Sequence, residues 1–235
     1  MNEGLTVPPS ASFYILLQRT DNQSVALSRL LRRVPGRFSL AFAQIEALVR
    51  RKHIASRFVR GIRRDFNSIA GVLPKHVNAI LDVGCGLAAI DILLSRHYTD
   101  YDPVQLYLAD FGDTSSRIEY GFGRHPSRYN SLSVANELLV SNHIPPKTIH
   151  FISPDDIARD DSLPPLQVVI STLAWGFHFP VETYAQVISS AMAPEGRLIL
   201  DVRTGTDGID RLRDYFLVVE LIEETEKWRR VVARR

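Results

Sequence analysis

The stretch that decides the fold reads Ala79-Ile-Leu-Asp-Val-Gly-Cys-Gly-Leu-Ala-Ala-Ile-Asp91. Its first five residues are mostly apolar and of strand length, which predicts a buried strand that ends at Val83. Gly84 and Gly86 then allow a sharp turn, because glycine adopts backbone dihedral angles that other residues avoid and leaves room for a ligand to approach the main chain. A helix is predicted to begin near Ala88, so the stretch predicts a strand, a tight turn and a helix.

The remainder of the C-terminal two thirds continues this alternation. Short apolar runs predict strands and the amphipathic stretches between them predict helices, which is typical of βαβ units around a parallel sheet. The predicted strands are Ala79–Val83, Val104–Asp110, Thr148–Ile152, Leu166–Ser171 and Arg197–Val202, and the predicted helices lie near Ala89–Arg96, Ser131–Asn142 and Val181–Ala193. Two further strands, Tyr215–Glu223 and Trp228–Ala233, are separated by a short turn. They predict an antiparallel hairpin on one edge of the sheet.

The N-terminal third has a different pattern. Residues 1–23 show no sustained periodicity and are predicted to be loosely structured, whereas residues 24–73 are predicted to be helical, with a break at 35–36. The clearest helix has an apolar face of Ile54, Phe58, Ile62, Phe66 and Ile69 and a basic face of Arg57, Arg60, Arg63 and Arg64. We therefore predict a basic helical extension or cap over residues 1–75 and an α/β domain over residues 76–235.

Composition and charge exclude several classes of protein. The 235 residues carry a net charge of +2, but residues 1–75 hold 13 Lys and Arg against 4 Asp and Glu, and residues 76–235 hold 15 against 22. The single cysteine excludes an intrachain disulfide framework, and the histidines lack metal-ligand spacing, so no metal is predicted. No run reaches the roughly 20 apolar residues of a spanning helix. Without a secretory signal pattern at the N-terminus, a cytoplasmic location is predicted.

The residues around the glycine turn resemble a known family. Residues 81–86, Leu-Asp-Val-Gly-Cys-Gly, resemble the first motif of class I S-adenosylmethionine-dependent methyltransferases. The resemblance implies a Rossmann-like seven-stranded, mostly parallel sheet, with Asp82, Gly84, Cys85 and Gly86 at the methionine end of S-adenosylmethionine. The glycine spacing also satisfies a relaxed dinucleotide fingerprint. The Asp82 charge favours S-adenosylmethionine, because a carboxylate attracts a sulfonium and an ammonium but repels a pyrophosphate.

Further matches to the same family imply further cofactor contacts. Asp110 ends the second predicted strand, where the family's acidic residue bonds the ribose hydroxyls, and Phe111 follows it. Asp155 falls where the family places an acidic residue near the adenine amino group. Ser171 ends the fourth strand, where the family often has aspartate, and it is assigned to the cofactor site. The family's third glycine is Ala88 in this chain, which is a departure from the pattern.

The segment after the fourth strand is the first candidate for the acceptor site. Residues 171–180 follow that strand, and the resemblance implies that this loop borders the transferred methyl group. Trp175 and Phe177 are predicted to form an aromatic wall for the acceptor beside His178. A positioned histidine suits removal of a proton from a hydroxyl group, so His178 is predicted to be catalytic. The alternative is that His178 is an ordinary hydrogen-bonded pocket residue.

The second candidate is the segment 111–130, which is longer than an ordinary connection. Tyr120 and Arg124 are predicted to bind the acceptor there, since arginine holds anionic or sugar-like groups well. A solvated insertion is an equally compatible interpretation. Together with residues 171–180, this segment is similar to uncharacterised methyltransferases assigned to sugar O-methylation. That similarity implies methyl transfer to a small hydroxyl-bearing molecule, either a sugar or a secondary-metabolite intermediate.

Two other functions stay open at this point. An NAD-dependent oxidoreductase would use the same glycine turn, with Asp110 on the ribose. An RNA methyltransferase would use the basic N-terminal helices, because Arg and Lys side chains bind phosphates. Those helices could also bind a membrane surface, or only cap the cleft. The acceptor and the oligomeric state stay open as well.

Overall fold

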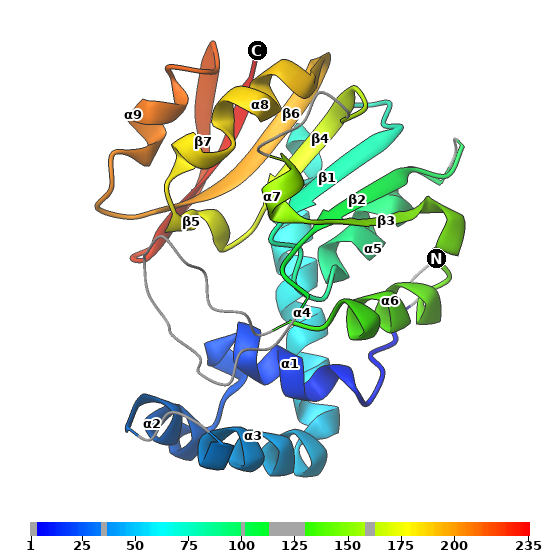
Figure 1. Cartoon of the computed structure of the whole chain (residues 1–235), viewed down its shortest axis with the longest axis vertical. Helices are drawn as coiled ribbons and strands as arrows, with labels where there is room; N and C mark the ends of the chain where they lie inside the picture. Colours follow the sequence, from blue (N-terminus) through cyan, green and yellow to red (C-terminus); the bar gives the residue numbers. More distant parts are fainter. Residues whose placement is uncertain (1–3, 34–36, 100–101, 113–129, 158–162) are drawn as a thin grey trace.

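A seven-stranded sheet forms the centre of the protein, with strand order β3-β2-β1-β4-β6-β8-β7 (Figure 1). The computed structural model describes residues 4–33, 37–99, 102–112, 130–157 and 163–235. The strands are β1 (Ala79–Val83), β2 (Gln105–Ala109), β3 (Ile149–Ile152), β4 (Leu166–Ser171), β6 (Met192–Arg203), β7 (Val218–Glu224) and β8 (Trp228–Arg234). Tyr120 and Arg124, the predicted acceptor-binding residues, lie outside the described residues.

The pairing of the strands confirms the predicted fold class. Strands β3, β2, β1, β4 and β6 pair in parallel, and β8 and β7 add an antiparallel edge. Strands β1 and β4 coincide with the predicted strands. Strand β6 begins at Met192 instead of Arg197, because the chain bulges between the pairings of Leu166 and Val168 before regular pairing resumes.

Helices cover both faces of the sheet, and side chains of β1 alternate between two hydrophobic clusters. Ile80 packs with α5 (Ala89–His97), α6 (Leu132–Ser141) and the N-terminal helices. Leu81 and Val83 pack on the other face, with α7 (Pro154–Ile157), α8 (Ala185–Ala191) and α9 (Gly208–Leu212) (Figure 1). Burial on both faces explains why β1 is apolar almost throughout.

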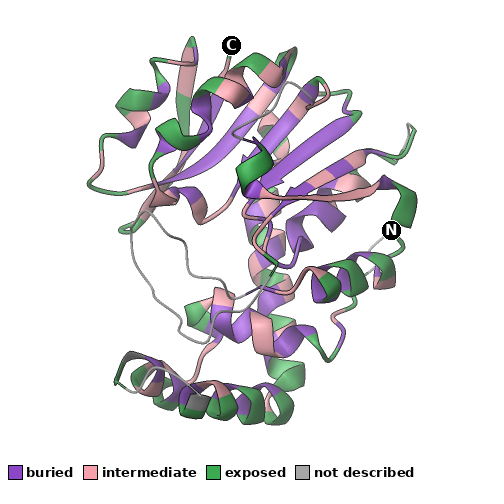
Figure 2. Cartoon of the chain, viewed as in Figure 1, coloured by how far each residue is buried: buried purple, intermediate pink, exposed green. Residues whose placement is uncertain are grey.

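The N-terminal third contains α1 (Ala11–Gln18), α2 (Val25–Arg33), α3 (Arg37–Val49) and α4 (Arg51–Ile69). Helix α1 shows that the prediction of loose structure for residues 1–23 is wrong. Ile15, Leu16 and Leu17 are fully buried in the cluster that covers one face of the sheet (Figure 2), so tertiary packing stabilises a segment without a regular apolar stripe. No helix in the described part of the chain is long and apolar enough to cross a membrane.

A buried ionic network joins α4 to the C-terminal strands. Arg230 of β8 is 1% exposed, and its Nε and Nη2 donate to the two carboxylate oxygens of Asp201 on β6 at 2.7 and 2.8 Å. Its Nη1 donates to the Ser68 hydroxyl at 2.9 Å and lies 3.8 Å from Asp65 Oδ1. Asp65 in turn accepts a hydrogen bond from Arg19 at 2.9 Å. The network therefore holds the N-terminal helices directly on the sheet.

Candidate active site

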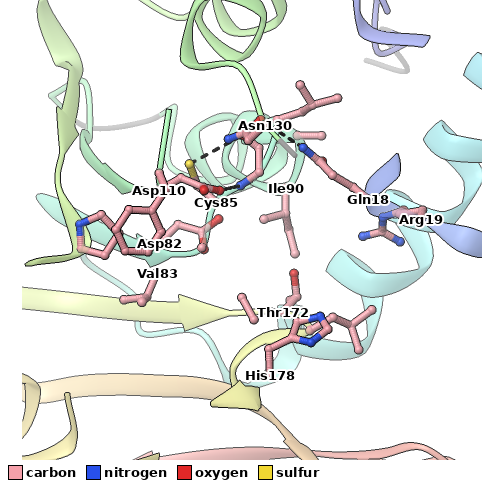
Figure 3. A pocket seen from close by; sticks show the side chains of 18 of the residues that line it. Gln18, Arg19, Asp82, Val83, Cys85, Ile90, Asp110, Asn130, Thr172 and His178 are labelled. Carbon is pink, nitrogen blue, oxygen red and sulfur yellow. Dashed lines mark hydrogen bonds between the residues drawn. The ribbon is translucent and has the colours of Figure 1, made fainter. Parts of the chain in front are cut away.

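A pocket opens where the carboxyl ends of β1 and β4 meet α1 and α4 (Figure 3). This edge, at which parallel strands end, is the usual place for a ligand in an open α/β sheet. Phe58 and Ile62 of α4 supply an apolar wall, so the N-terminal third contributes directly to the pocket. The other walls come from the glycine turn after β1, the end of β2 and the segment after β4.

The glycine turn has the sharp geometry predicted for it. Gly84, Gly86 and Ala88 all have left-handed backbone conformations, with φ of 77°, 55° and 54°. A Cβ atom on Gly84 would lie 2.3 Å from the Cβ of Ala174, so glycine is required at that position. Ala88 adopts the left-handed conformation without being glycine, at a cost of about 1 kcal/mol. Burial raises the pKa of the Cys85 thiol, which therefore stays protonated in the pocket wall.

Asp110 connects the end of β2 to this turn. Its Oδ2 accepts a hydrogen bond from the Gly86 N–H at 2.7 Å, and Asn130 donates to the Gly86 carbonyl, also at 2.7 Å. Burial raises the pKa of Asp110 to about 6, although hydrogen bonds from the N–H groups of Gly86 and Phe111 oppose the rise. Asp110, Phe111 and Asn130 all line the pocket. This wall offers acceptor oxygens and one aromatic ring to a ligand.

Two buried carboxyl groups lie beneath the turn. Asp82 on β1 lines the pocket, and Asp91 in the first turn of α5 is fully buried. Among the described residues, no donor of ordinary hydrogen-bond geometry reaches either Asp91 oxygen. Burial raises the pKa of Asp82 well above its usual range, the negative charge of Asp91 raises it further, and burial raises the pKa of Asp91 to about 6. Without a cation nearby, the two carboxyl groups are expected to retain a proton between them. A cationic ligand would stabilise their ionised form, so the pair is suited to such a ligand.

The substitution Asp91→Asn is expected to raise the free energy of unfolding of the ligand-free protein by about 1–3 kcal/mol at mildly alkaline pH. Because the folded-state pKa of Asp91 is raised from 3.8 to about 6, the native state binds more protons than the unfolded state across that interval. The free energy of unfolding therefore decreases as the pH rises through this interval. Asparagine removes this loss, and its amide can donate to Asp82.

Urea unfolding at acidic and alkaline pH measures the effect of Asp91→Asn. The exposed Asp102 provides the matched control, since Asp102→Asn removes the same charge at the surface. A variant whose stability depends on pH in the same way as the natural chain would contradict the assignment of this pH dependence to Asp91.

The end of α1 supplies two pocket residues that the sequence analysis missed. Gln18 donates to Asn130 Oδ1 at 3.0 Å, and Arg19 is held 2.9 Å from Asp65. Both line the pocket on the side away from the carboxyl group of Asp110 (Figure 3). The apolar run at 13–17 is the signal that could have revealed α1, although not its place beside the pocket.

The segment after β4 is not the loop that was predicted. It turns at Leu173, whose φ of 55° is unusual for a residue other than glycine, and then forms β5 (Ala174–Phe179) beside β6, outside the seven-stranded sheet. Thr172 and Leu173 line the pocket. Within β5, Ala174, His178 and Phe179 line the pocket, whereas Trp175 and Phe177 do not.

The contacts of two predicted site residues, Ser171 and Trp175, keep them out of the pocket. The Ser171 hydroxyl donates to the Val83 carbonyl at 2.6 Å and accepts from the Trp175 N–H at 2.9 Å, so it joins two backbone segments and does not line the pocket. Trp175 is fully buried, and its indole N–H donates to the Val181 carbonyl at 2.8 Å. The prediction that Trp175 forms an aromatic wall is therefore wrong, because the strand turns the indole into the core.

Of the three remaining predicted residues, one lines the pocket and two do not. His178 lines the pocket next to Thr172 (Figure 3). Phe177 does not line it, and its ring lies 4.6 Å below the Arg203 guanidinium. Asp155 is exposed at the start of α7, where its neighbour Pro154 lines the pocket instead. The structure thus brings His178 to the site and leaves Phe177 and Asp155 beside it.

Comparison with solved structures finds the same fold at low sequence identity. A candidate O-methyltransferase from Nostoc punctiforme matches with a TM-score of 0.54 and 13% identity, over 100% of this chain and 74% of that chain. The S-adenosylmethionine-dependent methyltransferase SibL, in its apo form, matches with a TM-score of 0.52 and 17% identity, over 97% and 69%. The fold is that of the class I methyltransferases. No protein-family model and no curated protein sequence matches the chain.

The methyltransferase fold explains why several predicted residues line the same pocket. In this fold the carboxyl ends of the parallel strands share one edge, so residues at the ends of β1 and β2 come together although they are far apart in the sequence. The predicted residues that line the pocket are Asp82, Gly84, Cys85, Gly86, Asp110, Phe111 and His178.

Proposed function

We propose that this protein transfers a methyl group from S-adenosylmethionine to the hydroxyl group of a small molecule, such as a sugar or a secondary-metabolite intermediate. One observation carries the proposal. A single pocket is lined by two carboxyl groups, the buried Asp82 and the half-buried Asp110, beside an open glycine turn, and a histidine, His178, lines the same pocket. The carboxyl groups favour a cationic ligand that carries a diol, and the histidine favours an acceptor that must lose a proton.

The residues of the pocket fit S-adenosylmethionine. Asp82 supplies negative charge for the ammonium and sulfonium groups of the methionine end. Asp110 already accepts a backbone hydrogen bond, and its carboxylate has the acceptor capacity to bind ribose hydroxyls. Gly84 and Gly86 leave the main chain open to close approach, and the Phe111 ring provides an apolar surface for a base. When bound, S-adenosylmethionine supplies an electrophilic methyl group.

The other pocket residues prepare the acceptor. His178 would take the proton of the acceptor hydroxyl as its oxygen becomes a nucleophile. Gln18 and Arg19 would orient the acceptor by hydrogen bonds from the end of α1. Phe58 and Ile62 exclude water from the same space. We therefore propose that residues 1–75 act as a cap that completes the acceptor side of the site.

Calorimetric titration tests the cofactor directly. S-adenosylhomocysteine is expected to bind and NADH is not, because a carboxylate at Asp82 repels a pyrophosphate. Binding of NADH without binding of S-adenosylhomocysteine would overturn the proposal in favour of an oxidoreductase. Transfer of labelled methyl from S-adenosylmethionine to a panel of sugars and phenols then tests the acceptor class.

Asp82→Asn is expected to weaken S-adenosylmethionine about 10–100-fold, because a charge-assisted hydrogen bond contributes about 1.5–3 kcal/mol. Methylthioadenosine, which lacks the ammonium and sulfonium charges, is expected to change much less. Since the pKa of Asp82 is raised by burial and by Asp91, a cation must displace a proton, and affinity for S-adenosylmethionine is expected to increase with pH. Titrations at several pH values, with Asp102→Asn as the control, measure both effects. An equal loss for both ligands would contradict the charge argument.

A further inference from the structure

Helix α3 presents its apolar side to solvent. Its buried side chains are small or polar, namely Ser39, Ala43, Glu46 and Ala47. Its exposed side chains include Phe38, Phe42, Ile45, Leu48 and Val49. A surface helix of a globular protein normally has the opposite arrangement, with its large apolar residues facing the core.

The exposed apolar residues of α3 form one stripe. Phe38, Phe42, Ile45 and Val49 follow each other at steps of four, three and four, which places them on a single helix face. Phe38, Ile45 and Val49 are 83%, 61% and 77% exposed, and Leu48 beside them is 76% exposed. The stripe is therefore continuous and open along the whole helix.

This stripe lies at the end of the molecule away from the sheet, where α2 and α3 pack together (Figure 1). Of the nine large exposed hydrophobic residues in the described ranges, six belong to α2 and α3, counting Val25 of α2. The others are Val140 on α6 and Leu217 and Leu221 at the C-terminal hairpin. Contiguous apolar patches of this kind mark interaction sites, whereas single exposed residues are ordinary.

The exposed charges of α2, α3 and α4 have one sign. Between residues 25 and 64, every exposed charged side chain that the structure describes is cationic. These side chains are Arg29, Arg33, Arg51, Lys52, Arg57, Arg60 and Arg64. The one acidic residue of this range, Glu46, and the adjacent Asp65 are buried in ion pairs with Arg50 and Arg19. The solvent-facing surface of the N-terminal helices therefore combines large apolar side chains with positive charge alone.

We propose that the α3 surface, defined as Val25, Phe38, Phe42, Ile45, Leu48 and Val49 with the exposed cations of α2 and of the start of α4 (Arg29, Arg33, Arg51 and Lys52), docks on an anionic lipid membrane. Phenylalanine, leucine and isoleucine enter the boundary between headgroups and acyl chains, while Arg and Lys bind anionic headgroups. The charge complementarity favours this occupant. A nucleic acid would neutralise the cations but leave the apolar stripe in water.

A second copy of this chain fits the surface less well. Two α3 surfaces facing each other would bring their cations together. The other exposed apolar residues, on α6 and at the C-terminal hairpin, are too scattered to cover the stripe. The proposal does not depend on methyl transfer.

Co-sedimentation with vesicles tests the proposal. The full chain is expected to bind vesicles of equal parts phosphatidylcholine and phosphatidylglycerol, and to bind pure phosphatidylcholine at least tenfold more weakly. Phe38→Ser with Ile45→Ser is expected to lower binding at least tenfold, because each ring or branched chain that enters the membrane contributes about 1.5–3 kcal/mol. Replacing Arg29, Arg33, Arg51 and Lys52 by glutamine is expected to lower binding about fivefold for each charge.

Leu217→Ser provides the matched control, since Leu217 is 88% exposed but lies outside the α3 surface. This variant is expected to bind as the natural chain does, and circular dichroism confirms that all variants are folded. Absence of vesicle binding would overturn the proposal. So would a dimer in light scattering that Ile45→Ser dissociates without any vesicle affinity, or binding of RNA in place of vesicles.

Discussion

Arg230→Met lowers the free energy of unfolding by about 3–5 kcal/mol, as is expected when one partner of a buried ion pair is removed. Arg230 and Asp201 face each other across β8 and β6, and neither is more than 1% exposed. Burial raises the pKa of Asp201, and the hydrogen bonds and charge of Arg230 oppose that rise. Methionine fills the volume but leaves the carboxylate without its cation. Urea unfolding followed by tryptophan fluorescence measures the loss.

Arg234→Met is the matched control for this experiment. Arg234 lies on the same strand and pairs with Glu220 at 2.7 Å, but its side chain is 35% exposed. A solvent-exposed pair contributes less than about 1 kcal/mol, so the same substitution there is expected to cost little. The double variant Asp201→Asn with Arg230→Met is expected to recover part of the stability, since it removes the unpaired charge. Equal losses for Arg230→Met and Arg234→Met would contradict the structural role of the buried pair.

His178→Gln is expected to lower the turnover number of methyl transfer by about 100-fold or more, because general base catalysis typically contributes that much. Glutamine keeps a polar side chain in the pocket but cannot accept a proton at neutral pH. The Michaelis constant for the acceptor and the affinity for S-adenosylhomocysteine are expected to stay within about twofold of those of the natural chain. Initial rates with the acceptor from the methyl-transfer panel measure the turnover.

His53→Gln is the control, because His53 is exposed on α4 away from the pocket. Turnover of His53→Gln is expected to equal that of the natural chain. If His178→Gln also keeps its turnover, His178 is a structural pocket residue. Methyl transfer would then depend on the positioning of the acceptor alone.

Local sequence patterns were sufficient to predict the strands at the centre of the sheet. Strands β1 and β4 were predicted to the residue, since a short apolar run bounded by turn residues has few other stable structures. The glycine turn was equally clear, because the left-handed backbone of Gly84 and Gly86 strongly favours glycine. Asp82 and Asp110 were assigned to one site by the resemblance to the methyltransferase family, and both line the pocket. These features depend on neighbours in the chain and on the geometry of a parallel sheet.

Position in the sequence was not sufficient to predict where a side chain points when its direction depends on packing. Trp175 was predicted to face the acceptor, but residues 174–179 form an extended strand, and its alternation buries the indole. Gln18 and Arg19 reach the pocket only because α1 packs against α4 and the sheet. No local pattern predicts such a contact.

The sequence by itself determined the alternation of strands and helices, the glycine turn and the acidic residues that end β1 and β2, because each is encoded by residues close together in the chain. Only the tertiary structure decided the partners of long side chains. It paired Arg230 with Asp201 and Asp65 with Arg19, and it left the apolar face of α3 in solvent. The physical reason is that burial and charge pairing depend on which distant segments come within a few ångströms of each other, and hydrophobic periodicity indicates only that a face prefers to be buried, not what covers it.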